Sequence, residues 1–112
     1  MALTMRSLIL FTPNMPRLAA FYRDVLGLPQ RTDDPGYKEF DAGGCRIALH
    51  NGSSEVGTRA PKIVFFSRDV AATRAELVSR GARLGKVLGR NGLIRCEGKD
   101  PDGNSYSISN RA

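Results

Sequence analysis

The order of apolar and polar residues predicts that the chain opens with a strand followed by an amphipathic helix. Ser7–Thr12 (SLILFT) is rich in β-favouring residues and stops at Pro13. Asn14 then predicts a helix N-cap, and Gly27 is expected to end the helix. Between them, apolar residues recur at the i, i+3, i+4, i+7 and i+8 positions of one helix face, which are Leu18, Phe21, Tyr22, Val25 and Leu26.

Three further strands are expected to complete this first half of the chain. A short strand is predicted near residues 28–32, and the turn Asp34-Pro35-Gly36 leads into a strand over Tyr37–Asp41. The Gly43-Gly44 turn then connects to a strand over Cys45–His50.

After a polar stretch over residues 51–60, which indicates a linker, the same order of elements starts again. Asp69 predicts the N-cap of a helix that runs to Gly81. The turn at residues 100–104 (DPDGN) is interpreted as a hairpin turn rather than a calcium loop, because Ser105 and Arg111 stand where such a loop needs Gly and Glu. The strands expected here are Lys62–Ser67, Leu84–Leu88, Leu93–Glu97 and Ser105–Ser109.

An internal repeat supports this division. Leu8, Leu10, Thr12 and Asn14 match Ile63, Phe65, Ser67 and Asp69 at an offset of 55 residues, and Asp41, Gly44 and Ala48 match Asp100, Gly103 and Ser107 at an offset of 59. Neither copy is expected to bury enough surface alone. We therefore predict a single domain over residues 1–112, made of module one (1–52), a linker (51–60) and module two (61–112).

Composition and charge indicate which classes of binding partner to expect. The net charge of +6 favours anionic ligands, but the Lys and Arg residues are spread along the chain without a run or a basic arm, so we expect no nucleic-acid partner. The apolar stretch at the N-terminus is too short to span a membrane and lacks a signal-peptide pattern, which predicts a cytoplasmic protein with no membrane partner. Cys45 and Cys96 form no C-x-x-C motif and are expected to be free thiols.

Three segments together resemble the vicinal oxygen chelate superfamily, the group of glyoxalases, bleomycin resistance proteins and extradiol dioxygenases. They are the helix from Asn14 to Leu28 with its FYRDVLGL end, the strand and cap at Ile63–Asp69, and the KDPDGN turn at Lys99–Asn104. The resemblance implies an α+β fold in which two βαβββ modules form a curved mixed sheet around a central cavity. It also implies a homodimer.

The resemblance further implies where a metal would be held, because metal-dependent members take ligands from four strands. The corresponding positions here are Ser7, Ala48, Lys62 and Ser107. None of these side chains is a good ligand for a divalent transition metal. His50 is the only histidine and is better explained as an exposed or hydrogen-bonded residue at a strand end. We therefore predict no metal and no cofactor.

Strand alternation assigns the side chains that would line the cavity. The predicted ligand-binding residues are Arg46, Lys62, His50, Phe11, Phe66, Ser107 and Arg95. Lys62 and Arg46 are expected to hold a carboxylate or phosphate group. In the alternative interpretation, Arg46 and Arg95 pair with Glu39 and Glu97 across neighbouring strands and only stabilise the sheet.

Three functions remain open at this point. The favoured hypothesis is a metal-free protein that binds a small anionic or aromatic molecule in a dimer-associated cavity. The second is a lyase, isomerase or dioxygenase of the same superfamily with a displaced or absent metal site, so whether the protein is an enzyme is not decided by its sequence. The third is a degenerate module whose main role is protein association.

Overall fold

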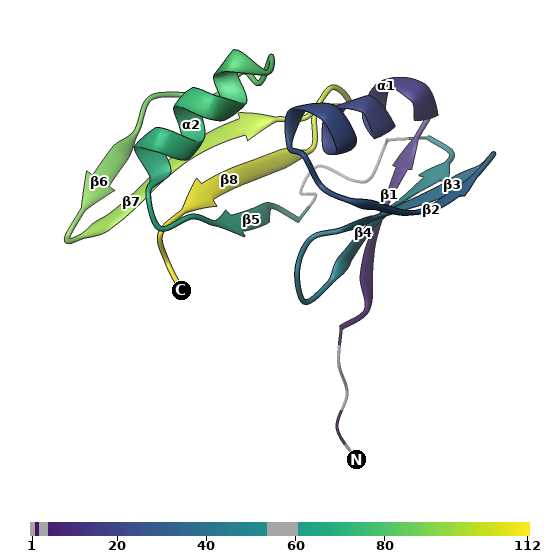
Figure 1. The fold of residues 1–112 in the computed structure, drawn as a ribbon, viewed down its shortest axis with the longest axis horizontal. Coiled ribbons are helices and arrows are strands. Elements are labelled where there is room, and N and C mark those ends of the chain that lie inside the picture. Colours follow the sequence, from purple (N-terminus) through teal and green to yellow (C-terminus); the bar gives the residue numbers. More distant parts are fainter. Residues whose placement is uncertain (1, 3–4, 54–60) are drawn as a thin grey trace. The chain divides into compact units, whose positions relative to one another are not determined.

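The computed structural model describes residues 2, 5–53 and 61–112, and the chain divides into two compact units, Met1–Val56 and Gly57–Ala112 (Figure 1). Most of the predicted linker, residues 54–60, lies outside the described residues. Each unit contains one helical segment and one four-stranded sheet, so each has the βαβββ order that the sequence predicts.

The first unit is built on a sheet with the strand order β1-β4-β3-β2. Strands β1 and β4 run parallel, and the β3 strand is antiparallel to both β4 and β2. Its elements are β1 (Ser7–Thr12), α1 (Met15–Ala20), the π-helix η1 (Phe21–Val25), β2 (Gln30–Asp34), β3 (Tyr37–Asp41) and β4 (Arg46–Asn51).

The predicted first helix is present, but it changes type halfway along. The Asn14 side chain caps α1 by accepting a hydrogen bond from the backbone of Arg17, as the sequence predicts. From Phe21 onward the backbone follows the wider π-helical turn of η1. That wider turn rotates the end of the predicted apolar face, which leaves Val25 and Leu26 only half-buried.

The second unit repeats this topology with the strand order β5-β8-β7-β6, in which β5 and β8 run parallel. The Asp69 side chain accepts a hydrogen bond from the backbone of Ala72 and so caps the helix, as predicted. The elements are β5 (Ile63–Phe66), α2 (Val70–Ser79), β6 (Leu88–Arg90), β7 (Leu93–Lys99) and β8 (Ser105–Ser109). Lys62 lies just before β5 rather than inside it.

The strand predicted over Leu84–Leu88 is wrong. Leu84 forms only an isolated bridge to Gly98, and the strand begins at Leu88. The Arg74 side chain of α2 donates to the backbone carbonyls of Leu84 and Gly85, at 3.0 and 2.7 Å. Those carbonyls accept from a side chain instead of a neighbouring strand, which explains why the pairing starts later.

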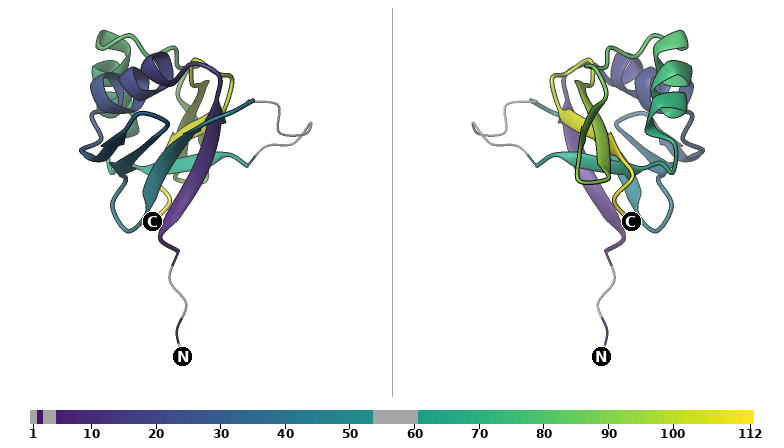
Figure 2. Two further views of the ribbon diagram at one scale, coloured as in Figure 1. Left: turned by 90° about the vertical axis from the view of Figure 1, so that its right-hand side faces the viewer. Right: turned by 90° about the vertical axis from the view of Figure 1, so that its left-hand side faces the viewer.

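In each unit the helix covers one face of the sheet and the opposite face carries no helix of that unit (Figures 1 and 2). The helix-covered side of the first unit holds the buried side chains of Phe40, Ile47 and Leu49, and that of the second unit holds Cys96, Tyr106 and Ile108. Among the described residues, no helix has the length and apolar character needed to cross a membrane.

Candidate ligand-binding faces

The two helix-free sheet faces carry the residues that the sequence predicts to bind a ligand. We call them the first face, on strands β1, β4 and β3, and the second face, on strands β5, β8 and β7. Alternation along the paired strands brings Phe11, Arg46 and His50 to the first face. It brings Phe66, Ser107 and Arg95 to the second face, with Lys62 beside them.

A buried carboxylate, Glu39, forms the centre of the first face. Its side chain is only 3% exposed. Arg6 donates to it through two nitrogens, at 2.8 and 3.2 Å, and Arg46 donates from Nη1 to Oε1 at 2.8 Å. The hydroxyl groups of Tyr37 and Thr32 also donate to Glu39. The predicted alternative for Arg46, in which it pairs with Glu39, is therefore the arrangement that the structure has.

These contacts determine the ionisation of the cluster. Hydrogen bonds from Arg6, Tyr37 and Arg46 hold the pKa of Glu39 well below its usual range, although burial opposes the shift. The hydrogen bond to Glu39 also raises the pKa of Tyr37. Two guanidinium groups thus share one carboxylate, which leaves one net positive charge. Because the side chains of Arg6 and Arg46 are 66% and 37% exposed, part of that charge faces solvent.

Aromatic and apolar side chains flank this charged cluster on the first face. The rings of Phe11 and His50 lie 5.3 Å apart between centroids, and those of Tyr37 and His50 lie 6.2 Å apart. Phe11 and Ile9 of strand β1 are 43% and 46% exposed. The first face therefore offers an apolar surface beside a cationic group.

The second face has a smaller version of the same arrangement. Lys62 donates from Nζ to Oε1 of Glu97 at 2.7 Å, and the Arg95 guanidinium lies 3.6 Å from the same oxygen. The Lys62 ammonium is the main cause that lowers the pKa of the Glu97 carboxyl. Val64 and Phe66 of strand β5 are each 57% exposed beside this cluster. Arg95 thus shares Glu97 with Lys62, although the two residues Arg95 and Glu97 belong to one strand.

The two clusters occupy equivalent places in the repeat. Glu39 lies opposite Ala48 in the β3–β4 pairing, and Glu97 lies opposite Ser107 in the β7–β8 pairing. Ala48 and Ser107 are the matched positions of the internal repeat. Each unit therefore places one carboxylate, shared by two cations, on the same sheet face as the exposed apolar side chains of the strand two places away.

The sequence analysis did not identify Arg6 and Thr32 as members of the first cluster. Arg6 precedes β1, and extending the strand alternation would assign it to the helix-covered side. Thr32 lies opposite Glu39 in the regular register that continues from the Asp34–Tyr37 pair, and the register shifts only beyond Thr32, toward Gln30. The prediction of a short strand near residues 28–32 carried no pairing register, so it did not place Thr32 beside Glu39.

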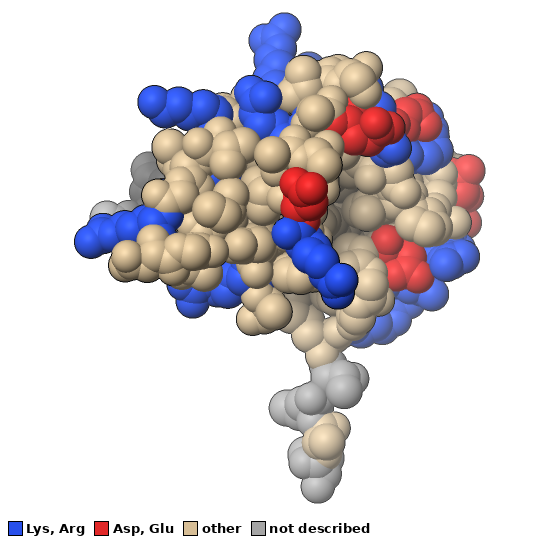
Figure 3. All heavy atoms as spheres, turned by 60° about the vertical axis from the view of Figure 1, so that its left-hand side comes forward, with Lys and Arg blue, Asp and Glu red and all other residues tan. Residues whose placement is uncertain are grey.

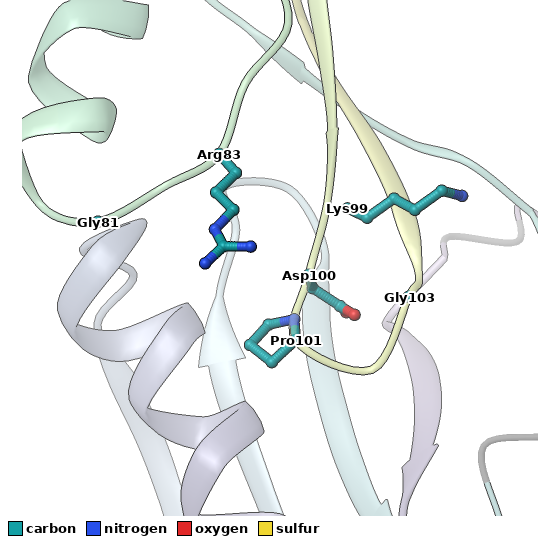
Figure 4. A pocket seen from close by; sticks show the side chains of 6 residues that line it. All are labelled: Gly81, Arg83, Lys99, Asp100, Pro101 and Gly103. Carbon is teal, nitrogen blue, oxygen red and sulfur yellow. The ribbon is translucent and has the colours of Figure 1, made fainter.

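Two open pockets lie at the ends of these sheets. One, of about 420 Å³, adjoins the first cluster and is lined by Met5, Arg6, Asp41, Gly43, Gly44, Cys45 and Arg46. The other, of about 620 Å³, is formed by the loop after α2 and the β7–β8 turn (Figure 4). In this second pocket Arg83 points toward Pro101 while Lys99 points away from Arg83, so the two cations do not converge. Only the first pocket contains a predicted site residue, Arg46.

Comparison with known proteins agrees with this fold. The family model of the Glyoxalase/Bleomycin resistance protein/Dioxygenase superfamily matches residues 4–108, so the chain belongs to that superfamily. The sequence matches no curated protein.

Several solved structures share the fold at low sequence identity. A glyoxalase/bleomycin resistance protein/dioxygenase from Nocardioides superposes with a TM-score of 0.82 at 17% identity, covering 97% of this chain and 83% of the other. A lactoylglutathione lyase from Agrobacterium tumefaciens gives 0.77 at 20% identity, covering 95% and 92%. A virulence protein from Salmonella typhimurium gives 0.76 at 22% identity, covering 97% of each chain. These likenesses show the fold alone.

The residues at the four expected metal positions do not fit a divalent metal. Ala48 has no donor atom, and Ser7 and Ser107 offer only neutral hydroxyl groups. The fourth position, Lys62, carries an ammonium group that donates to Glu97. No group of three or more His, Cys, Asp or Glu side chains comes together in the part of the chain that the structure describes. The nearby carboxylates Glu39 and Glu97 are already held by cationic side chains.

Proposed function

We propose that this superfamily member binds a small organic anion with an aromatic or apolar body, and that it does so without a metal ion. The observation that carries the proposal is the duplicated arrangement of two cations on one carboxylate beside exposed apolar side chains. The cations can attract a carboxylate or phosphate group, and the apolar strand can cover the rest of the molecule.

The first face is the stronger of the two candidate sites. Arg46 uses Nη1 on Glu39, while its remaining guanidinium nitrogens make no further hydrogen bond among the described residues. A guanidinium that is already fixed by a buried carboxylate loses little side-chain freedom when it binds an anion, which lowers the entropic cost of binding. Phe11 and His50 would then cover an aromatic ring of the ligand.

A ligand screen tests this proposal. Aromatic carboxylates and aromatic phosphates, each paired with its uncharged amide or alcohol, are added to the protein while its melting temperature is recorded, and hits are confirmed by calorimetry. We expect the anions to raise the melting temperature and the uncharged partners to leave it unchanged. The proposal is wrong if no anion is preferred over its uncharged partner.

Two substitutions assign the binding to the clusters. Arg46→Gln and Lys62→Gln each remove one cation, and we expect each to weaken anion binding by about tenfold. Arg23→Gln is the matched control, because Arg23 also pairs with a carboxylate, Asp24, but lies on η1. Equal loss of binding in the control would contradict a site on the two faces.

We also propose that the protein is a homodimer, which light scattering during size-exclusion chromatography tests.

A further inference from the structure

The charge of the protein is distributed unequally between its two units. Residues 61–112 contain ten Lys and Arg against five Asp and Glu, whereas residues 5–53 contain six against five. The second unit therefore accounts for nearly all of the net positive charge. The sequence viewed as a single chain did not reveal this, because the cations are spread along it without a run.

The excess comes from one continuous segment. Residues 77–96, from the end of α2 through β6 into β7, contain five cations and no acidic residue. In the space-filling view, several Lys and Arg side chains project from the surface with no acidic side chain beside them (Figure 3). Arg83, Lys86 and Arg90 of this segment are exposed and form no ion pair among the described residues.

Apolar side chains are exposed among these cations. Leu88 of strand β6 and Leu93 of β7 are 39% and 42% exposed. Leu88 pairs with Arg95 and Arg90 pairs with Leu93 in the β6–β7 register, so the leucines and arginines alternate on one face of the hairpin. Strand β6 is also the outermost strand of its sheet. We call the surface formed by Lys86, Leu88, Arg90 and Leu93 the β6 edge surface.

We infer that the β6 edge surface binds an acidic protein segment that also carries apolar side chains. Carboxylates of such a segment complement Lys86 and Arg90, and its apolar residues cover Leu88 and Leu93. An edge strand can in addition pair its outer backbone groups with an extended segment. This interaction surface adjoins the Glu97 cluster, because Leu88 is the cross-strand neighbour of Arg95, but its own cations, Lys86 and Arg90, pair with neither Glu39 nor Glu97 among the described residues. It does not depend on the proposed small-molecule function.

Other occupants fit this surface less well. A second copy in a two-fold interface would place the same cations against each other, which is repulsive. Nucleic acid would satisfy the cations but would leave the leucines without an apolar partner, and residues 77–96 contain no aromatic side chain on which bases could stack. The same absence of Trp, Tyr and Phe disfavours a membrane interface.

Fluorescence anisotropy on the full chain at low salt tests the inference. The probe is a short labelled peptide in which Glu residues alternate with Leu and Ser, and its control has Gln in place of every Glu. We expect the Glu peptide to bind and the Gln peptide to bind at least about tenfold more weakly. A short DNA duplex and phosphatidylserine-containing vesicles serve as competitors, and the inference fails if either binds more tightly than the Glu peptide.

Two variants with the same net charge locate the surface. We expect Lys86→Glu with Arg90→Glu to weaken peptide binding by about tenfold. Arg68→Glu with Arg111→Glu changes the charge equally at exposed positions of the same unit outside residues 77–96, and we expect a change of less than about twofold. Leu88→Ser, which alters no charge, should weaken binding by about threefold. Equal weakening by both charge-reversed pairs, or no binding of the Glu peptide to the unmodified protein, would overturn the inference.

Discussion

Arg46 is the cross-strand neighbour of Asp41 in the β3–β4 register, yet its guanidinium donates to Glu39, with 2.8 Å between Nη1 and Oε1. Glu39 lies two residues earlier on the same strand and on the same face of the sheet, where Arg6 also reaches it. The contact makes Arg46 part of a buried network rather than an unengaged cation. Its role in ligand binding therefore depends on how firmly Glu39 holds it.

Removing the charge of Glu39 should lower the stability of the fold. Glu39→Gln keeps the size of the side chain but leaves Arg6 and Arg46 without their carboxylate, and we expect the free energy of unfolding to fall by about 2 kcal/mol. Glu97→Gln is the matched control, because its side chain is 45% exposed, and it should cost less than about 0.5 kcal/mol. Urea denaturation of the three proteins measures both values. Equal losses would mean that the buried network adds nothing beyond a surface ion pair.

The same network predicts a dependence of stability on pH. The pKa of Glu39 is lowered in the folded protein, chiefly by the hydrogen bond from Arg6, so the carboxylate is stabilised relative to the unfolded chain. Its contribution is fully present above the unfolded pKa of about 4.3 and is lost as the pH falls toward the folded value. The stability difference between wild type and Glu39→Gln should therefore be constant at neutral pH and shrink below about pH 4. Urea titrations at several pH values measure it, and a difference that stays constant in acid would contradict the assignment.

The residues at the four expected metal positions predict the metal content of the purified protein. Because Ser7, Ala48, Lys62 and Ser107 do not form a set of metal ligands, the purified protein should contain no stoichiometric divalent metal. Treatment with a chelator should leave the melting temperature and anion binding unchanged. Elemental analysis combined with thermal melts checks both. Tight binding of one equivalent of zinc, nickel, iron or manganese would show that a displaced site exists.

The fold was predictable from the sequence because its signals are local or repeated. The caps Asn14 and Asp69 each hold a backbone N–H as predicted, and the strand Ser105–Ser109 has the expected bounds. The errors lie where tertiary contacts decide the backbone. Arg74 binds two carbonyls of the segment that was predicted to be a strand, and the sequence of that segment carries no sign of this.

The members of the candidate sites were predictable only in part, because tertiary contacts of long side chains also decide them. Alternation correctly assigned Phe11 and Phe66 to the helix-free faces, where both are exposed. It left open whether Arg46 pairs with Glu39, since the choice depends on the reach of long side chains. It could not find Arg6, whose contribution comes from a residue outside any strand.

Substitutions at two adjacent glycines in the β3–β4 turn distinguish the effect of backbone strain from the effect of limited space for a side chain. Gly43 has a φ of +101°, while Gly44 has no positive φ in the left-handed region, and a Cβ at either position would meet nothing within 4 Å. Gly43→Ala should therefore lower the free energy of unfolding by about 1 kcal/mol, because an L-residue is strained at that φ. Gly44→Ala should leave stability unchanged or raise it by up to about 0.5 kcal/mol, because it restricts the unfolded chain without strain. Chemical denaturation distinguishes the two, and equal effects would show that packing rather than φ governs this turn. Because both residues line the pocket beside Arg46, anion binding by the two variants also reports whether the turn shapes that pocket.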